Sequence, residues 1–171
     1  MPPYTLEPLM TVSATSEKPD SPGVNLYPPI VFALCLLGGI GAEFALRPQF
    51  HLLPRDVALY AGVAVAVFGL LIQGIGWVGF KRRGAEIRTN RPVPMIVTSG
   101  AHRISRNPMY VGFVAMLTGI GLAADSLPML LGALAMFLYL DWYVIAREER
   151  YLSRTFGEEY EMYCRKVRRW L

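Results

Sequence analysis

The stretch VALYAGVAVAVFGLLIQGIGW, residues 57–77, decides the fold because its 21 residues include no charged side chain. A helix needs about 20 mostly apolar residues to cross the hydrocarbon core of a bilayer. Three further apolar blocks occupy residues 28–46, 109–124 and 127–146. None of the four carries the polar stripe of period 3.6 that a soluble helical bundle requires. The sequence therefore predicts an all-α membrane protein with about four transmembrane helices.

The first 27 residues differ in composition from the rest of the chain. They are rich in Pro, Ser and Thr, and they lack the apolar segment behind a basic start that a cleavable signal peptide needs. We interpret residues 1–27 as a mobile N-terminal tail. Residues 28–171 are expected to form a single membrane-embedded domain.

Positive charge is concentrated in two segments. Of the 17 Lys and Arg residues, seven lie between residues 81 and 106 and seven between residues 147 and 169. Two predicted spans separate the segments, so both lie on one side, which the positive-inside rule makes cytoplasmic. Four spans also place both termini there. Anionic lipid headgroups are the expected partner rather than nucleic acid, because five glutamates offset the charge of the C-terminal segment.

The cysteines and histidines do not form a metal-binding set. Cys35 falls inside the first apolar block and Cys164 in the charged C-terminal segment, while His51 and His102 are isolated. No pair has the spacing of metal ligands, and the two cysteines are too differently placed to predict a disulfide. The sequence therefore predicts no metal site.

A basic collar, residues 103–110, precedes the third apolar block in RISRNPMYVGF (103–113). Asn is favoured at the N-cap and Pro at the first helical position, so Asn107 and Pro108 predict the start of a helix. A helix N-terminus attracts anions, and Arg103, Arg106 and Tyr110 flank this one in the sequence. The collar therefore fits either a site for a carboxylate or phosphate, or an anchor among lipid headgroups.

Two adjacent carboxylates, Glu148 and Glu149, directly follow the fourth block on the same side as the collar. Such a pair can accept hydrogen bonds from an ammonium group or a ribose diol. Neighbouring residues lie about 100° apart on a helix, so the two cannot face one ligand equally. Glu148 continues the helical face of Asp141, and Glu149 continues that of Trp142. Which of these faces lines a pocket is left open.

The rest of the C-terminal segment predicts an interfacial amphipathic helix, interrupted at Gly157. Its apolar side chains recur at steps of three and four residues, at Leu152, Phe156, Tyr160, Tyr163, Val167 and Trp170. Such a helix lies on the membrane, covers a site, or does both.

The two polar segments together resemble a known superfamily. SGAHRISRNPMYVG (99–112), followed by EERYLSRTFGEEYEMYCRKVRRW (148–170), is similar to the isoprenylcysteine carboxyl methyltransferases and phospholipid methyltransferases. Their pattern runs G-x-Y-x-x-x-R-[HN]-P-x-Y, then E-E-x-x-L, F-G and spaced tyrosines. The matching residues are Gly100, Arg106, Pro108, Tyr110, Glu148, Glu149, Leu152, Phe156, Gly157, Tyr160 and Tyr163. Two positions depart from it: His102 replaces a Tyr, and Asn107 stands where the carboxyl methyltransferases usually have His.

The resemblance implies an integral-membrane methyltransferase that uses S-adenosylmethionine and a lipophilic membrane substrate. The acceptor is either an isoprenylcysteine-like carboxylate or a phospholipid amine. The implied cofactor-binding residues are Gly100, His102, Arg103, Arg106, Asn107, Pro108, Tyr110, Glu148, Glu149 and Tyr160. The arginines would hold the cofactor's carboxylate, the glutamates its ammonium or ribose hydroxyls, and the tyrosines its adenine.

The catalytic candidates depend on the acceptor. Arg147 would orient a carboxylate acceptor, whereas Glu149 or His102 would remove a proton from an amine. Two other functions stay open. A sterol-reductase-like NADPH oxidoreductase would carry a related R-[HN]-P-x-Y pattern, and a non-catalytic membrane scaffold or transport subunit would bind no cofactor.

Overall fold

The computed structural model describes residues 21–46, 51, 53–82 and 95–171. Residues 1–20, which make up most of the predicted tail, lie outside the described residues, as do the basic residues Arg83, Arg88 and Arg91. Residues 21–27 are described, and Val24 is only 1% exposed because it packs into the helical core. The segment next to the first helix is therefore packed against the bundle.

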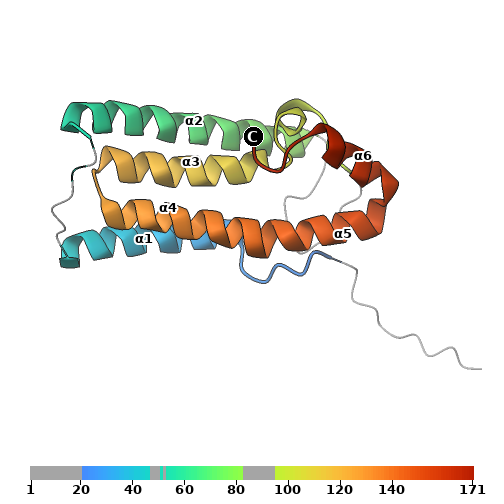
Figure 1. Cartoon of the computed structure of the whole chain (residues 1–171), viewed down its shortest axis with the longest axis horizontal. Helices are drawn as coiled ribbons and strands as arrows, with labels where there is room; N and C mark the ends of the chain where they lie inside the picture. Colours follow the sequence, from blue (N-terminus) through green and yellow to red (C-terminus); the bar gives the residue numbers. More distant parts are fainter. Residues whose placement is uncertain (1–20, 47–50, 52, 83–94) are drawn as a thin grey trace, which may run out of the picture.

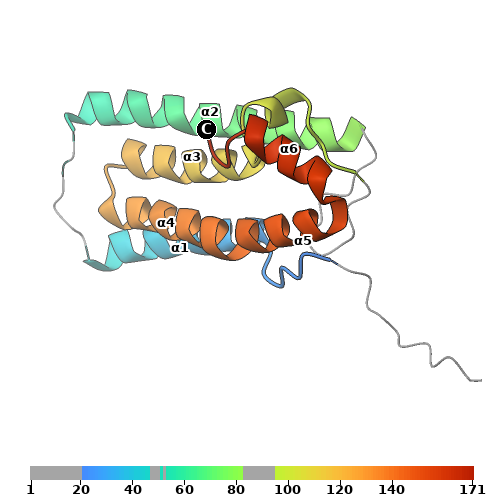
Figure 2. The ribbon, with the colours of Figure 1, turned by 45° about the vertical axis from the view of Figure 1, so that its right-hand side comes forward.

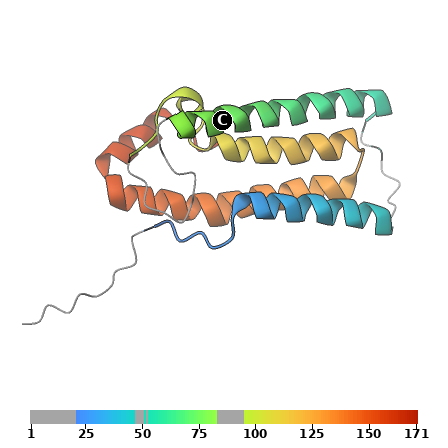
Figure 3. The same ribbon diagram turned by 180° about the vertical axis from the view of Figure 1, so that it is seen from behind.

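Four apolar helices lie side by side in a bundle (Figure 1). They are α1 (Pro28–Leu46), α2 (Arg55–Arg82), α3 (Pro108–Ala123) and α4 (Leu127–Leu138). α2 packs against α3, α3 against α4, and α4 against α1, which lies in front of α4 when the bundle is seen from behind (Figure 3). Among the described residues, the named elements are all helical.

The C-terminal part extends beyond the bundle and then returns to it. α4 continues through a π-helical segment, η2 (Tyr139–Ile145), into α5 (Ala146–Phe156). Gly157, with a φ of 50°, separates α5 from α6 (Glu158–Lys166), as the predicted interruption requires. α6 turns back toward α2 and α3 (Figure 2), where a short 3₁₀ helix, η1 (Gly100–Arg103), precedes α3.

The predicted fold class is confirmed: the protein is an all-α integral membrane protein. Three helical stretches are long and apolar enough to cross a bilayer, at Pro28–Leu46, Arg55–Gly79 and Leu127–Phe156. α3 is also apolar but has only 16 residues, in line with the short third block of the sequence. The last of these three stretches extends beyond the fourth predicted block, to residue 156 rather than 146, because η2 and α5 continue the helix.

Glycines allow α2 and α3 to touch along their backbones. A Cβ atom added to Gly62 would lie 2.3 Å from the nitrogen of Ala123, and one added to Gly119 would lie 2.3 Å from that of Ala66. Small residues permit this approach in lipid, where packing replaces the hydrophobic effect as the source of helix association. Gly74 differs, because a Cβ there would meet no atom within 4 Å. This glycine lies away from α3.

The end of the bundle distant from the collar is closed by polar contacts. The buried hydroxyl of Ser126 donates to Glu43 of α1 over 2.6 Å, and the Met129 N–H donates to that hydroxyl over 3.4 Å. Glu43 is thereby hydrogen-bonded within the protein and tied to the start of α4. The core behind this end is apolar, and its fully buried side chains include Leu117 and Met136.

Candidate functional site

The last five residues, 167–171, which we call the C-terminal strap, run back across the collar. Ser105 and Arg168 form an isolated parallel β-bridge, beside which the Arg106 N–H donates to the Arg168 carbonyl over 2.9 Å. The side-chain amide of Asn107 donates to the carbonyl of Arg169 over 3.0 Å. These hydrogen bonds hold the collar and the strap together at the N-terminus of α3.

α3 begins at Pro108, directly after Asn107, so the predicted helix start is confirmed. Asn107 makes no capping hydrogen bond with its side chain, because its amide is turned toward the strap. Its backbone N–H instead donates to the buried hydroxyl of Ser105 over 3.0 Å. The residue therefore connects the collar to the C-terminus as well as starting the helix.

Arg106 points into the molecule and links three elements. Its Nη2 lies 3.1 Å from Glu149 Oε1 on α5, and its Nη1 donates to Tyr160 on α6 over 3.5 Å and contacts the Cys164 sulfur. The side chain is only 15% exposed. Its Nε is buried and has no hydrogen-bond partner among the described residues. A buried donor of this kind favours an anionic ligand, because leaving it unpaired costs free energy.

The two adjacent glutamates have different partners. Glu148 accepts a hydrogen bond from the buried Tyr110 hydroxyl over 2.7 Å. Glu149 pairs with Arg106 and also accepts from Nε of Arg169 over 3.2 Å. Glu149 thus lies between two guanidinium groups, whereas the observed partner of Glu148 is a neutral phenol. Of the two, Glu148 is the better acceptor for a positively charged ligand group.

Asp141, in the π-helical segment, completes this cluster. It accepts from Nη1 of Arg169 over 3.2 Å and from the indole N–H of Trp170 over 2.9 Å. The indole ring also packs on Phe137, with ring centroids 4.9 Å apart. The hydrogen bonds of Arg169 to Glu149 raise the pKa of Arg169 above its ordinary value. The strap is therefore anchored by a charged and an aromatic residue.

The expected alignment of the glutamates with the preceding turns is wrong. The sequence placed Glu148 on the face of Asp141 and Glu149 on that of Trp142. Arg169 instead contacts both Asp141 and Glu149, while Trp142 is 71% exposed. The cause is the π-helical segment η2, since i→i+5 hydrogen bonding adds a residue to the turn and shifts the helical faces that follow.

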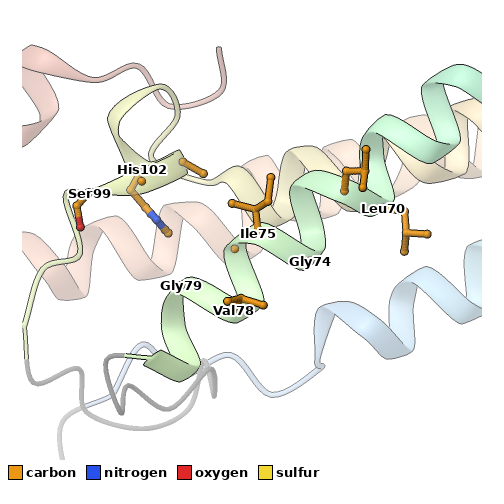
Figure 4. A pocket seen from close by; sticks show the side chains of 11 residues that line it. Leu70, Gly74, Ile75, Val78, Gly79, Ser99 and His102 are labelled. Carbon is orange, nitrogen blue, oxygen red and sulfur yellow. The ribbon is translucent and has the colours of Figure 1, made fainter.

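Four other predicted residues lie away from this cluster. Arg103 is exposed, and Gly100 begins η1 with a φ of 66°. Arg147 stacks on the ring of Tyr143, 3.8 Å from its centroid. The imidazole of His102 points from η1 toward α2 (Figure 4), and its carbonyl accepts from Tyr163. Burial raises the pKa of this tyrosine to about 12, so its hydroxyl keeps its proton.

The structure brings together six of the predicted residues and adds three that the motif did not include. The six are Arg106, Asn107, Tyr110, Glu148, Glu149 and Tyr160; the three are Asp141, Arg169 and Trp170. Asp141 was signalled by its position in an apolar block, where a carboxylate is costly. No sequence pattern predicted a role in this cluster for Arg169 and Trp170, because that role depends on the strap folding back onto the collar.

Comparison with known proteins identifies one family. A family model described as Phospholipid methyltransferase matches residues 57–159, which include the collar and both glutamates but not the strap. A protein of Haemophilus influenzae described as uncharacterized is 40% identical over 63 residues, which are 37% of this chain and 100% of that protein. No solved structure is significantly similar to the chain.

Proposed function

The chain belongs to the phospholipid methyltransferase family, and we propose that it transfers a methyl group from S-adenosylmethionine to a lipophilic acceptor at the cytoplasmic face of the membrane. The observation that carries the proposal is the convergence of Arg106, Tyr110 and Glu148 at the N-terminus of α3, a helix inside the matched region. A basic group, a phenol and a carboxylate at one helix end suit a zwitterionic ligand.

The polar side chains at this site match the charged groups of S-adenosylmethionine. The unpaired Nε of Arg106 is suited to the carboxylate of the methionine moiety, and the N-terminus of α3 adds to the attraction. Glu148, with its neutral partner Tyr110, is suited to the ammonium group. Tyr160, whose hydroxyl accepts from Arg106, is the candidate to contact the adenine. When bound, the cofactor supplies a methyl group on a positively charged sulfonium.

The protein's own contribution would be alignment and exclusion of water, because methyl transfer is an in-line displacement. α6 and the strap lie close to the N-terminal end of α3 (Figure 2), where Arg169 of the strap holds Glu149 and Trp170 holds Asp141. Glu149 would act mainly by positioning Arg106 and Arg169, with which it forms ion pairs.

The acceptor remains one of two chemical classes. For a phospholipid amine, a base must remove a proton, and His102 is a better candidate than Glu149, whose carboxylate is held by two guanidinium groups. For a carboxylate acceptor no base is needed, and Arg147, stacked on Tyr143, is the candidate that orients it.

Titration of the purified protein in detergent micelles tests the proposal. S-adenosylhomocysteine should bind the wild type, and binding should weaken in Arg106→Ala. NADPH should not bind; binding of NADPH alone would favour a sterol-reductase-like oxidoreductase. Binding of neither would favour a scaffold or transport subunit. The acceptor class is tested by incubating the protein with tritiated S-adenosylmethionine in bilayers that contain either phosphatidylethanolamine or a farnesylated cysteine. The compound that becomes tritiated is the acceptor.

A further inference from the structure

Arg169, in the C-terminal strap, holds both carboxylate oxygens of Glu149. Its Nε donates to Oε1 over 3.2 Å, and its Nη2 pairs with Oε2. One edge of the guanidinium thus makes two side-by-side hydrogen bonds to one carboxylate. A bidentate pair of this kind fixes the orientation of the carboxylate as well as its position. Glu149 on α5 is therefore held in one orientation by a residue of the strap.

The guanidinium of Arg169 is itself held by other parts of the chain. Its remaining nitrogen, Nη1, donates to Asp141 in η2 over 3.2 Å. The backbone carbonyl of Arg169 accepts from the side-chain amide of Asn107 over 3.0 Å and from the Ser105 hydroxyl over 3.4 Å. Contacts with η2 and with the collar therefore set the place from which Arg169 reaches Glu149.

The consequence is seen at Arg106, which has only one ion-pair contact with Glu149. Nη2 of Arg106 lies 3.1 Å from Oε1 of Glu149. Nε, on the same edge of the Arg106 guanidinium, is buried and has no hydrogen-bond partner in the part of the chain that the structure describes. The oxygen that would complete a bidentate pair with this Nε is Oε2 of Glu149, which Arg169 holds. Without Arg169, Glu149 would turn Oε2 toward Nε, because an unpaired buried donor costs free energy.

This competition for Nε takes place in a poorly hydrated part of the protein. The exposed fraction of the side chain falls from 38% for Arg169 to 20% for Glu149 and 15% for Arg106. Hydrogen bonds to charged groups are strong where water is scarce. An anionic ligand group at Nε would therefore bind well, and a Glu149 that paired with Nε would deny it that donor.

We propose that Arg169 is a positioning residue for the cofactor: by holding both oxygens of Glu149, it leaves Nε of Arg106 to the carboxylate of S-adenosylmethionine. The assignment rests on the proposed function, since it concerns how Arg106 binds that carboxylate. Arg169 acts through Glu149 and needs no contact with the cofactor. The strap, which lies outside the matched residues 57–159, thus becomes part of the binding apparatus.

Two ligands that differ only in the carboxylate test this role. They are S-adenosylhomocysteine and its decarboxylated analogue, which keeps the ammonium group, the ribose and the adenine. Each is titrated calorimetrically into the full-length protein in detergent micelles. Arg169→Ala should weaken S-adenosylhomocysteine about fivefold to tenfold, the effect of losing one hydrogen bond to a charged group. The decarboxylated analogue should bind the variant and the wild type equally, because it makes no use of Nε.

Two further variants separate geometry from charge. Arg169→Lys keeps the positive charge, but an ammonium group cannot hold both oxygens of Glu149 side by side. It should therefore still bind S-adenosylhomocysteine more weakly than the wild type does, with the analogue unaffected. Arg165→Ala removes the same charge from an exposed position on α6 and should bind both ligands as the wild type does. If Arg169→Ala does not elute as a folded species from a sizing column, Arg169→Lys carries the same comparison.

Three outcomes would overturn the inference. Equal weakening of both ligands would make Arg169 a support of the fold alone. Unchanged affinity for S-adenosylhomocysteine in Arg169→Ala would separate the strap from the cofactor, and full recovery in Arg169→Lys would leave only a charge effect.

Failure of the proposed function gives a different result. If the wild type binds neither ligand, the methyltransferase proposal fails and this inference fails with it. If the wild type binds both ligands equally well, the carboxylate contributes nothing at Arg106. That result would overturn the role of Arg169 while leaving cofactor binding, and with it the proposed function, in place.

Discussion

Replacing each adjacent glutamate by glutamine should separate cofactor binding from structural support. In the wild type the Tyr110 hydroxyl donates to Glu148 Oε1 over 2.7 Å. In Glu148→Gln the amide oxygen can still accept this hydrogen bond, so the fold should be retained. The variant loses the negative charge that would face the cofactor's ammonium group. We expect S-adenosylhomocysteine to bind at least tenfold more weakly, which is a loss of about 1.4 kcal/mol in binding free energy. This loss is near the lower end of the range for a hydrogen bond to a charged group.

Glu149→Gln should act mainly on stability. Glu149 pairs with Arg106 at 3.1 Å and with Arg169, and the three side chains are 15–38% exposed. A hydrogen bond to a charged group contributes about 1.5–3 kcal/mol when buried, and partial exposure reduces this. We therefore expect the free energy of unfolding to fall by about 1–2 kcal/mol. Cofactor binding should weaken less than in Glu148→Gln.

Both quantities can be measured on the same preparations. Calorimetric titration with S-adenosylhomocysteine gives the affinity, and thermal unfolding in micelles gives the stability. Glu158→Gln, an exposed acidic position at the start of α6, is the control and should change neither. The reasoning is refuted if Glu148→Gln is well folded and binds as tightly as wild type. Equal destabilisation by the two Gln variants would refute the assignment of Glu149 as the structural member.

Arg106→Ala should weaken S-adenosylhomocysteine binding by about 1.5–3 kcal/mol in the same titration; unchanged affinity would make the collar only a headgroup anchor. Gly119→Leu should separate α2 from α3 and lower the yield of folded protein on a sizing column, because the α2 backbone lies 2.3 Å from its added Cβ, whereas Gly74→Ala should not. Cys164 should react with a membrane-impermeant thiol reagent only from the cytoplasmic face, while Cys35, inside α1, stays protected; labelling of Cys164 on intact cells would contradict the proposed topology.

Hydropathy and helix-start chemistry predicted the bundle well because both depend on local sequence. The first apolar block coincides with α1, and Asn107-Pro108 marks the start of α3. α2 and α3 approach each other closely at Gly69, and residues 57–77, the block that contains it, are rich in glycine. These features require only that apolar segments enter a membrane and that small residues permit contact.

The charged cluster was only partly predictable, because it depends on the return of the chain. Arg103 and Arg106 look equivalent in sequence, yet Arg103 is exposed and Arg106 points at Glu149. The difference arises from the bridge between Ser105 and Arg168, which fixes the side on which each collar residue lies. No local sequence pattern predicts that the strap folds back onto the collar.

The π-helical segment explains why the acidic residues meet as they do. In a regular α-helix, residues seven apart differ by only about 20° in direction, so Asp141 would align with Glu148. The wider turn of η2 takes up one more residue, so Asp141 aligns with Glu149, eight positions on, and one guanidinium reaches both. Glu148 is thereby turned toward Tyr110, away from Arg169. A π-helical turn in this helix thus separates the two glutamates, leaving one neutralised by arginines and the other available for a cation.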